Sequence, residues 1–236
     1  MYTNRVHRVL HRGLPRTGKF AVALAIMALV GAFGAASGTA GTLGSSSPTC
    51  TLASDTTQPF LGWGDSNQYF LAPGGAMESD LTAAGWQLSG GAGLAAGNEP
   101  WQVTSPADGS SLSLPPGSSA ISAPVCVTTH DPYFRVFTQS QGSQTAQIQV
   151  DAMFTGNNGQ PMVKRVGYIA ANGGWALSDP IKFVNAIQPG SDGLASLSFR
   201  FTVVGNATFS LDDLYIDPIK SQNGFGWGGG GWGGCC

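Results

Sequence analysis

Hydrophobic and polar residues alternate with a period of two through the second half of the chain. The longest run covers residues 146–154, where apolar residues at even positions are separated by mostly polar ones. Residues 133–138, 162–170 and 197–203 give further candidate strands, and residues 208–217 give the last one. Successive side chains of a strand point to opposite faces, so these runs predict strands with one buried and one solvated face.

Shorter apolar stretches in the first half of the chain are separated by glycine and proline. These turn residues leave candidate strands at residues 68–71, 85–90, 101–103, 111–114 and 125–127. Trp86, in the second of them, is expected in the core. No stretch beyond the N-terminal segment has convincing helical periodicity. Many short strands broken by turns predict an all-β fold, an antiparallel two-sheet β-sandwich.

The last predicted strand carries two adjacent acids, Asp212 and Asp213. Neighbouring residues of a regular strand face opposite sides, so at least one carboxylate faces inward unless a bulge intervenes. A buried carboxylate needs a cation, an arginine or backbone N–H donors. The pair is therefore a candidate either for a bound cation or for capture by backbone donors.

The N-terminal segment has the organisation of a secretory signal. Five basic residues precede an apolar run over residues 20–36, small residues follow to position 40, and no acid occurs before Asp55. This pattern predicts a signal peptide with its apolar helix over residues 1–40, then a Gly/Ser linker over 41–49. A retained membrane anchor is the alternative, but the apolar run is short for a span. The mature protein is expected outside the cell or at its surface, with no membrane segment.

Charge argues against two classes of partner. Only 10% of the residues are charged, and the chain without residues 1–40 has six basic residues against thirteen acidic ones. A mature protein with this negative balance is not expected to bind nucleic acid or an anionic membrane surface.

All four cysteines lie beyond the signal segment, where disulfides can form. Cys50 and Cys126 are the preferred pair, and closing a loop of about 75 residues stabilises by roughly 4 kcal/mol in the chain-entropy model. Cys235 and Cys236 end a Gly/Trp-rich stretch over residues 220–236, which cannot form a core of its own and is expected to be a disordered tail. These two thiols are expected to pair between copies or to remain free.

The order of several motifs resembles the galactose-binding-like jelly rolls that include many bacterial carbohydrate-binding modules. The motifs are residues 75–79 with Glu78, the Gly85-Trp86 pair, residues 108–114 and the final acidic strand at 211–217. The chain is also similar to exported bacterial proteins with one such domain and a cysteine pair. The change in composition after Lys220 predicts a folded domain over residues 50–219. The resemblance covers about residues 68–218 and implies that this domain is a jelly roll.

The resemblance also implies a structural calcium between the first and last strands. Glu78 matches the early carboxylate of such modules, and Asp212 or Asp213 matches the late one. Calcium would neutralise these acids and accept backbone carbonyls as further ligands. The alternative is that Glu78 caps a turn and the aspartates accept backbone N–H groups.

A carbohydrate-binding surface is expected on the polar faces of the regular strands. Planar amides, arginine and aromatic rings suit the hydroxyls and C–H faces of sugars. The candidate ligand-binding residues are Tyr133, Arg135, Gln147, Gln149, Asp151 and Arg200. The implied partner is a polysaccharide or cell-wall glycan. The alternative is an ordinary solvated sheet face.

Two other functions are weighed against carbohydrate binding. The Cys-Cys tail favours a structural protein that is crosslinked or assembled through Cys235 and Cys236. A hydrolase is disfavoured because His130 lies in a turn, no Gly-x-Ser-x-Gly elbow occurs, and the only two Glu residues are Glu78 and Glu99. Convergence of His130 and Glu99 with another acid in one cleft would argue for an enzyme.

Overall fold

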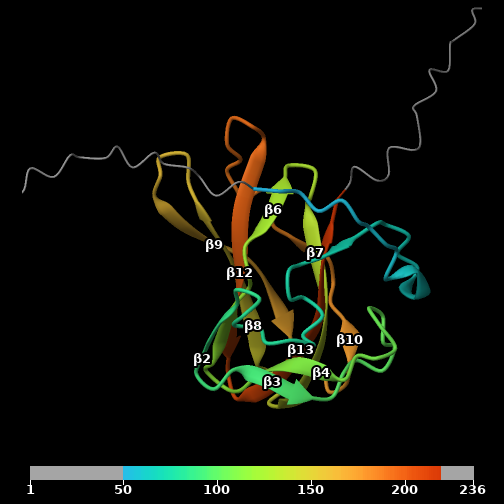
Figure 1. Cartoon of the computed structure of the whole chain (residues 1–236). Helices are drawn as coiled ribbons and strands as arrows, with labels where there is room; N and C mark the ends of the chain where they lie inside the picture. The colour runs from blue at the N-terminus through green and yellow to red at the C-terminus, as the bar shows by residue number, and fades with distance from the viewer. Residues whose placement is uncertain (1–49, 219–236) are drawn as a thin grey trace, which may run out of the picture. The chain divides into compact units, whose positions relative to one another are not determined.

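The computed structural model describes residues 50–218, and these residues form an all-β sandwich of two antiparallel sheets (Figure 1). The predicted fold class is confirmed. The predicted signal peptide at 1–40, the linker at 41–49 and the tail at 220–236 lie outside the described residues. Within residues 50–218, no helix is long and apolar enough to cross a membrane.

One sheet has seven strands. Its main path runs through β10 (Ala176–Leu177), β7 (Tyr133–Gly142), β13 (Ala207–Asp217), β4 (Ser110–Leu114) and β3 (Gly93–Ala96). Two short strands extend it, with β1 (Phe70–Leu71) on β13 and β11 (Ile181–Lys182) on β7.

The other sheet has six strands. Its main path runs through β2 (Gln87–Ser89), β5 (Ser119–Ile121), β12 (Leu194–Val204), β8 (Gln147–Thr155) and β9 (Pro161–Ala170), and β6 (Val125–Thr128) pairs with β12. The long strands are those with the clearest alternation in sequence, because a regular two-residue period suits a strand with one buried face.

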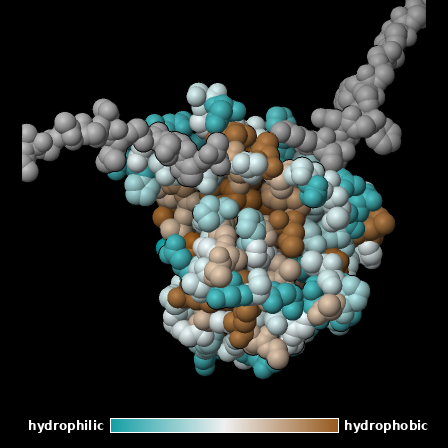
Figure 2. All heavy atoms as spheres, viewed as in Figure 1, coloured by the Kyte–Doolittle hydropathy of each residue, from teal (hydrophilic) through white to brown (hydrophobic). Residues whose placement is uncertain are grey.

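The main core lies between the two sheets and is built from the apolar faces of these strands. Trp86 is 1% exposed and stacks on Phe201 of β12, so its predicted core position is confirmed. Phe134 and Phe199 pack against each other from opposite sheets, with ring centroids 4.6 Å apart. On the face seen in Figure 2, hydrophobic residues reach the surface in patches, and polar residues surround them.

One predicted strand is wrong. Residues 101–103 form turns and bends rather than a strand. The carboxylate of Glu99 accepts hydrogen bonds from the backbone N–H groups of Trp101 and Val103, and Gln102 has a positive φ of 50°. These backbone groups are therefore turned toward a local side chain, which excludes them from a sheet ladder.

The outer face of the seven-stranded sheet is covered by the segment before β1. This segment contains a short 3₁₀ turn, η1 (Leu61–Trp63). Phe60 and Tyr69 from the segment pack with Phe137 and Tyr215 from the sheet in a second, aromatic core. The segment thus buries a sheet face that would otherwise be open to solvent.

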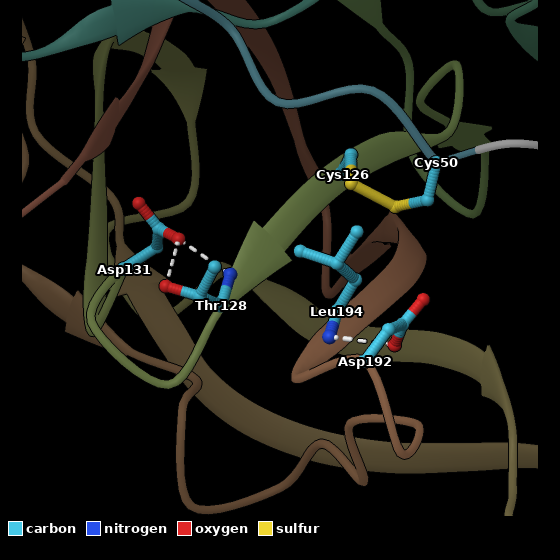
Figure 3. Close-up of a disulfide and its surroundings, with 6 residues drawn as sticks. All are labelled: Cys50, Cys126, Thr128, Asp131, Asp192 and Leu194. Atoms are coloured by element: carbon cyan, nitrogen blue, oxygen red, sulfur yellow. Dashed lines mark hydrogen bonds between the residues drawn. A yellow bond between two sulfur atoms is a disulfide. The ribbon is translucent and has the colours of Figure 1, made fainter.

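The predicted disulfide joins Cys50 to Cys126, with Cα atoms 5.3 Å apart (Figure 3). Cys126 lies on β6, which pairs with the start of β12 near Leu194. Just beyond β6, Asp131 accepts hydrogen bonds from the backbone N–H and the hydroxyl of Thr128 (Figure 3). The bond therefore fixes the beginning of the described chain to an ordered strand of the six-stranded sheet.

Candidate functional site

The outer face of the six-stranded sheet carries a connected group of polar side chains around Asp151 of β8. Asp151 is 3% exposed, and its Oδ2 accepts hydrogen bonds from Arg200 Nη2 at 2.7 Å and Arg200 Nε at 3.2 Å. Gln149 Nε2 lies 3.1 and 3.0 Å from the two carboxylate oxygens. Ion pairing to a fork-shaped guanidinium holds both partners in a defined orientation.

Strand β9 adds Arg165 and Tyr168 to this group. Arg165 Nε lies 3.8 Å from Asp151 Oδ1, Arg165 Nη1 donates to the Tyr168 hydroxyl at 2.6 Å, and the guanidinium lies over the Tyr168 ring. The side chain of Arg165 and the residue Tyr168 are 53% and 45% exposed, so both are open to a ligand. We call Gln149, Asp151, Arg165, Tyr168 and Arg200 the polar face.

Sequence reasoning missed Arg165 and Tyr168 because they are three positions apart, which places them on opposite faces of a regular strand. The register of β8 and β9 shifts by one residue, since Val150 pairs with Gly167 while Asp151 pairs with Arg165. This bulge brings the two side chains onto one face. A glycine within a strand often marks a bulge, so Gly167 was the sequence feature that could have indicated this one.

The surroundings of the polar face are mixed in character. By strand register, Thr202 lies beside Gln149, and Ile121 lies beside Arg200. Next to Tyr168, a cavity of about 280 Å³ lies between β9 and the β10–β11 segment. Asn172 lines this cavity, and its buried Oδ1 has no hydrogen-bond partner in the described structure. The arrangement offers donors, acceptors and one aromatic ring to a flat or extended polar ligand.

The six predicted ligand-binding residues are divided between the two sheets. Gln147, Gln149, Asp151 and Arg200 lie on the outer face of the six-stranded sheet, whereas Tyr133 and Arg135 lie on β7 of the other sheet. Since the main core separates the inner faces of these sheets, the two sets do not form one site.

Arg135 is enclosed by the segment before β1. Its Nη1 donates to Asp65 Oδ2 at 2.8 Å, and its Nε and Nη2 donate to the Ser178 carbonyl at 3.0 and 2.8 Å. The side chain is 13% exposed and lies over the Phe60 ring. Through the ion pair with Asp65, Arg135 of β7 therefore links the segment before β1 to the seven-stranded sheet.

The acidic pair at the end of the chain lies at a bulge in β13. The pairing of β13 with β7 shifts register between Asp212 and Tyr215, and Asp213 has a positive φ of 55°. Aspartate adopts this left-handed conformation more readily than most residues. From Leu211 to Asp217 every residue of β13 is buried, on both faces of the strand, and the two carboxylates are each 1% exposed.

Glu99 joins this pair and forms a buried group of three acids. The Glu99 backbone N–H donates to Asp212 Oδ2 at 3.3 Å, and the Asp213 N–H donates to Asp212 Oδ1 at 2.9 Å. Asp213 Oδ1 accepts from the Thr104 hydroxyl, and Asp213 Oδ2 is buried and has no hydrogen-bond partner among residues 50–218. We call Glu99, Asp212 and Asp213 the acidic cluster.

Burial raises the pKa of Asp212 to about 8, and the Asp213 charge adds to the effect. Burial also raises the pKa of Asp213 to about 7, with further contributions from Glu99 and Asp108. A carboxylate that loses water and faces other acids binds a proton more tightly. A proton or a cation would therefore stabilise this group.

Glu78 is not part of the acidic cluster and has different hydrogen-bond partners. Its Oε1 accepts hydrogen bonds from the backbone N–H groups of Gly109 and Ser110 at 2.9 and 2.7 Å. Burial, followed by the charges of Glu78 and Glu99, raises the pKa of Asp108. Among residues 50–218, no three Asp, Glu, His or Cys side chains form a ready-made metal site.

The candidate catalytic residues are not assembled. His130 is an exposed residue of the turn between β6 and β7, and its backbone N–H bonds the Thr128 hydroxyl. Glu99 contacts Trp101, Val103 and Asp212 through its hydrogen bonds, and His130 is not among these partners.

No protein-family model matches the chain, and no curated protein matches it. Among solved structures, it is similar to the CBM22-1 xylan-binding domain from Paenibacillus barcinonensis Xyn10C, with a TM-score of 0.43, 15% identity and coverage of 61% of this chain and 91% of that one. It is also similar to the C-terminal family 22 carbohydrate-binding module of Clostridium thermocellum Xyn10B, with a TM-score of 0.41, 14% identity and coverage of 66% and 97%.

A third similar structure is the family 11 carbohydrate-binding module of the Clostridium thermocellum cellulase Lic26A-Cel5E. Its TM-score is 0.34, with 14% identity and coverage of 56% of this chain and 86% of that one. These neighbours are carbohydrate-binding modules, the group that the sequence resembles. At these TM-scores their ligands and binding residues do not transfer to this chain.

Proposed function

We propose that this protein is a secreted, non-catalytic module that binds an extracellular or cell-wall polysaccharide on the polar face. The observation that carries the proposal is the network around Asp151, in which two arginines and a glutamine are held by one buried carboxylate beside an exposed tyrosine. Sugars present hydroxyls that donate and accept hydrogen bonds, and C–H faces that stack on aromatic rings. The polar face supplies partners for hydroxyls that donate, for hydroxyls that accept and for C–H faces.

Binding to immobilised glycans tests the proposal. The full chain is expected to bind at least one plant or microbial wall polysaccharide, and Tyr168→Ala is expected to weaken that binding about tenfold through loss of a stacking contact. Gln139→Ala changes an amide on β7 of the other sheet and serves as the control. Failure of every glycan to bind at millimolar concentration would contradict the proposal, as would equal affinity of Tyr168→Ala and the parent.

The absence of catalysis is part of the same proposal. A glycosidase needs two carboxylates on either side of the scissile bond. The two glutamates are each occupied by backbone N–H groups, Glu78 by Gly109 and Ser110, and Glu99 by Trp101 and Val103. Incubation with any polysaccharide that binds is expected to release no reducing ends. Release that Glu99→Gln abolishes would identify an enzyme.

The acidic cluster is the proposed position of the structural calcium. Calcium prefers oxygen ligands, and Asp213 Oδ2, which is buried and accepts no hydrogen bond from the described residues, is the oxygen of the cluster that most needs a cation. The charge of the Glu99 carboxylate helps to raise the pKa of both Asp212 and Asp213, whereas Glu78 acts on neither, so we assign Glu99 in place of Glu78 as the early carboxylate. The ion would neutralise like charges and join the loop after β3 to the bulge of β13.

Removal of calcium tests this assignment. Chelator is expected to lower the melting temperature of the full chain by several degrees, and added calcium should restore it. Asp213→Asn should abolish the response, whereas Asp192→Asn, in an exposed loop, should keep it. A melting temperature unchanged by chelator would show that protons and backbone donors alone stabilise the cluster.

A further inference from the structure

Charge is distributed unevenly between the two sheets of the sandwich. The strands of the six-stranded sheet carry three of the five basic residues within residues 50–218, namely Lys164, Arg165 and Arg200, and only one of the thirteen acids, Asp151. The acidic cluster lies around β13 of the seven-stranded sheet, and Asp65 and Asp217 are also associated with that sheet. Lys164 pairs with Ala152, which is on the same face of β8 as the core residues Val150 and Phe154, so Lys164 does not share the outer face with Arg165. A chain that is negative as a whole therefore has two arginines, Arg165 and Arg200, beside a single acid on the outer face of one sheet.

The polar face has more positive than negative charge at its centre. Arg165 and Arg200 approach opposite oxygens of the Asp151 carboxylate, at 3.8 and 2.7 Å. One carboxylate between two guanidinium groups leaves one positive charge without a partner. Asp151 is almost completely buried, so it orients the arginines but is not itself available to a ligand.

Both guanidinium groups keep nitrogen atoms for a ligand. Within residues 50–218, no hydrogen bond uses Arg165 Nη2 or Arg200 Nη1. Arg165 is the more exposed of the two, with 53% of its side chain accessible. Asp179, in the wall of the adjoining cavity, lies on the loop between β10 and β11 at the edge of the other sheet.

We infer that the polysaccharide bound by the polar face is acidic, with uronic-acid carboxylates that pair with Arg165 and Arg200. The inference rests on the proposed carbohydrate-binding function and names its substrate class. Guanidinium groups bind planar carboxylates through parallel N–H donors, with more strength and direction than they bind neutral hydroxyls. Tyr168 contacts Arg165 and is 45% exposed, so a sugar paired with Arg165 would be able to reach its ring.

The test compares polygalacturonate with its methyl ester, because esterification removes the charge and keeps the sugar backbone. The full chain is expected to bind polygalacturonate about tenfold more tightly than the ester, and the difference should shrink as salt rises from 50 to 500 mM. Arg165→Gln should remove the preference, and Arg165→Lys should retain part of it. Lys182→Gln, which removes the same charge from β11 on the other sheet, should retain all of it.

The outcomes separate this inference from the proposed function. Equal binding of the two polymers, or equal losses in Arg165→Gln and Lys182→Gln, would overturn the acidic ligand while a bound neutral glycan would still support carbohydrate binding. No binding to any glycan would contradict the proposed function itself. A dextran sulfate arm distinguishes the anion, because affinity equal to that for polygalacturonate would contradict the assignment to carboxylates.

Discussion

At the scale of single residues, the buried carboxylates differ in what surrounds them. Asp151 has two arginines, and Asp131 has the N–H and hydroxyl of Thr128. Asp217, 2% exposed at the end of β13, accepts a hydrogen bond from Asn67 on Oδ2, whereas its buried Oδ1 has no hydrogen-bond partner within the described part of the chain. Burial, followed by the charges of Asp65 and Asp131, raises the pKa of Asp217 to about 6.

The raised pKa of Asp217 predicts a dependence of stability on pH. Because the folded state binds the proton more tightly than the unfolded chain, this stabilisation is complete below about pH 4 and is lost as pH rises through 6. Asp217→Asn resembles the protonated form, so it should raise the free energy of unfolding at pH 8 by about 1–2 kcal/mol and bring no gain at pH 4.

Urea unfolding at a series of pH values measures this effect. Asp55→Asn, at an exposed position, is the control and should follow the parent at every pH. An Asp217→Asn variant whose stability runs parallel to that of the parent between pH 4 and 8 would contradict the prediction.

At the scale of elements, added side-chain atoms are least tolerated where strands meet closely. Two backbone hydrogen bonds join the turn after β1 to β13, from Ala72 N to Leu214 O and from Leu214 N to Gly75 O, and a third, from Gly75 N to Ala72 O, closes the turn itself. A Cβ on Gly75 would lie 2.8 Å from the carbonyl oxygens of both Ala72 and Leu214. Neither oxygen can move without breaking this junction.

Gly75→Ala is therefore expected to lower the free energy of unfolding by about 2–3 kcal/mol, because the clash falls on backbone atoms. Gly173→Ala is the matched control, since a Cβ at that position meets nothing within 4 Å. Chemical denaturation of both variants measures the difference. Equal stability of the two would show that the junction can widen at no cost.

Regular elements could be predicted from the sequence, and irregular ones could not. The alternation in β7, β8, β12 and β13 follows from one buried face and needs no knowledge of neighbours. The bulges at Asp213 and between Arg165 and Gly167 depend on the partner strand, so they could not be placed. Each bulge lies at a site: the first is at Asp213 of the acidic cluster, and the second brings Arg165 and Tyr168 onto one face.

Contacts between residues far apart in the sequence could not be predicted either, and they determine which candidate site residues are accessible. Arg135 alternates correctly on its strand, yet Asp65 lies 70 positions earlier and encloses it through a segment with no strand pattern. Glu99 reaches Asp212 across 113 positions. A period of two assigns a residue to a face, but it cannot say what covers that face.

At the scale of the whole molecule, the disulfide closes a loop of 76 positions between Cys50 and Cys126. Its removal should lower the free energy of unfolding by about 3–4 kcal/mol in the chain-entropy model, because the unfolded chain regains its freedom. Guanidinium unfolding of Cys50→Ser/Cys126→Ser against the parent measures this. A loss below about 1 kcal/mol would show that the loop is already restricted in the unfolded state.

The C-terminal cysteines give a prediction about assembly from sequence alone, since residues 220–236 lie outside the described part of the chain. Adjacent thiols at a Gly-rich end are expected to crosslink copies of the chain. Non-reducing gels of the full chain should show a dimer that disappears in Cys235→Ser/Cys236→Ser. Identical monomer bands for the two proteins would exclude this assembly.

The same disulfide has a mechanical consequence. A pulling force applied at the first described residue enters at Cys50 and passes through the covalent bond to β6, which is paired with β12. The chain between the two cysteines, with β1 to β5 and the segment that covers the seven-stranded sheet, lies in a closed loop outside this shorter path. Tension between the two ends of the domain would therefore act on β6, β12 and β13, and the polar face would share a sheet with the loaded strands.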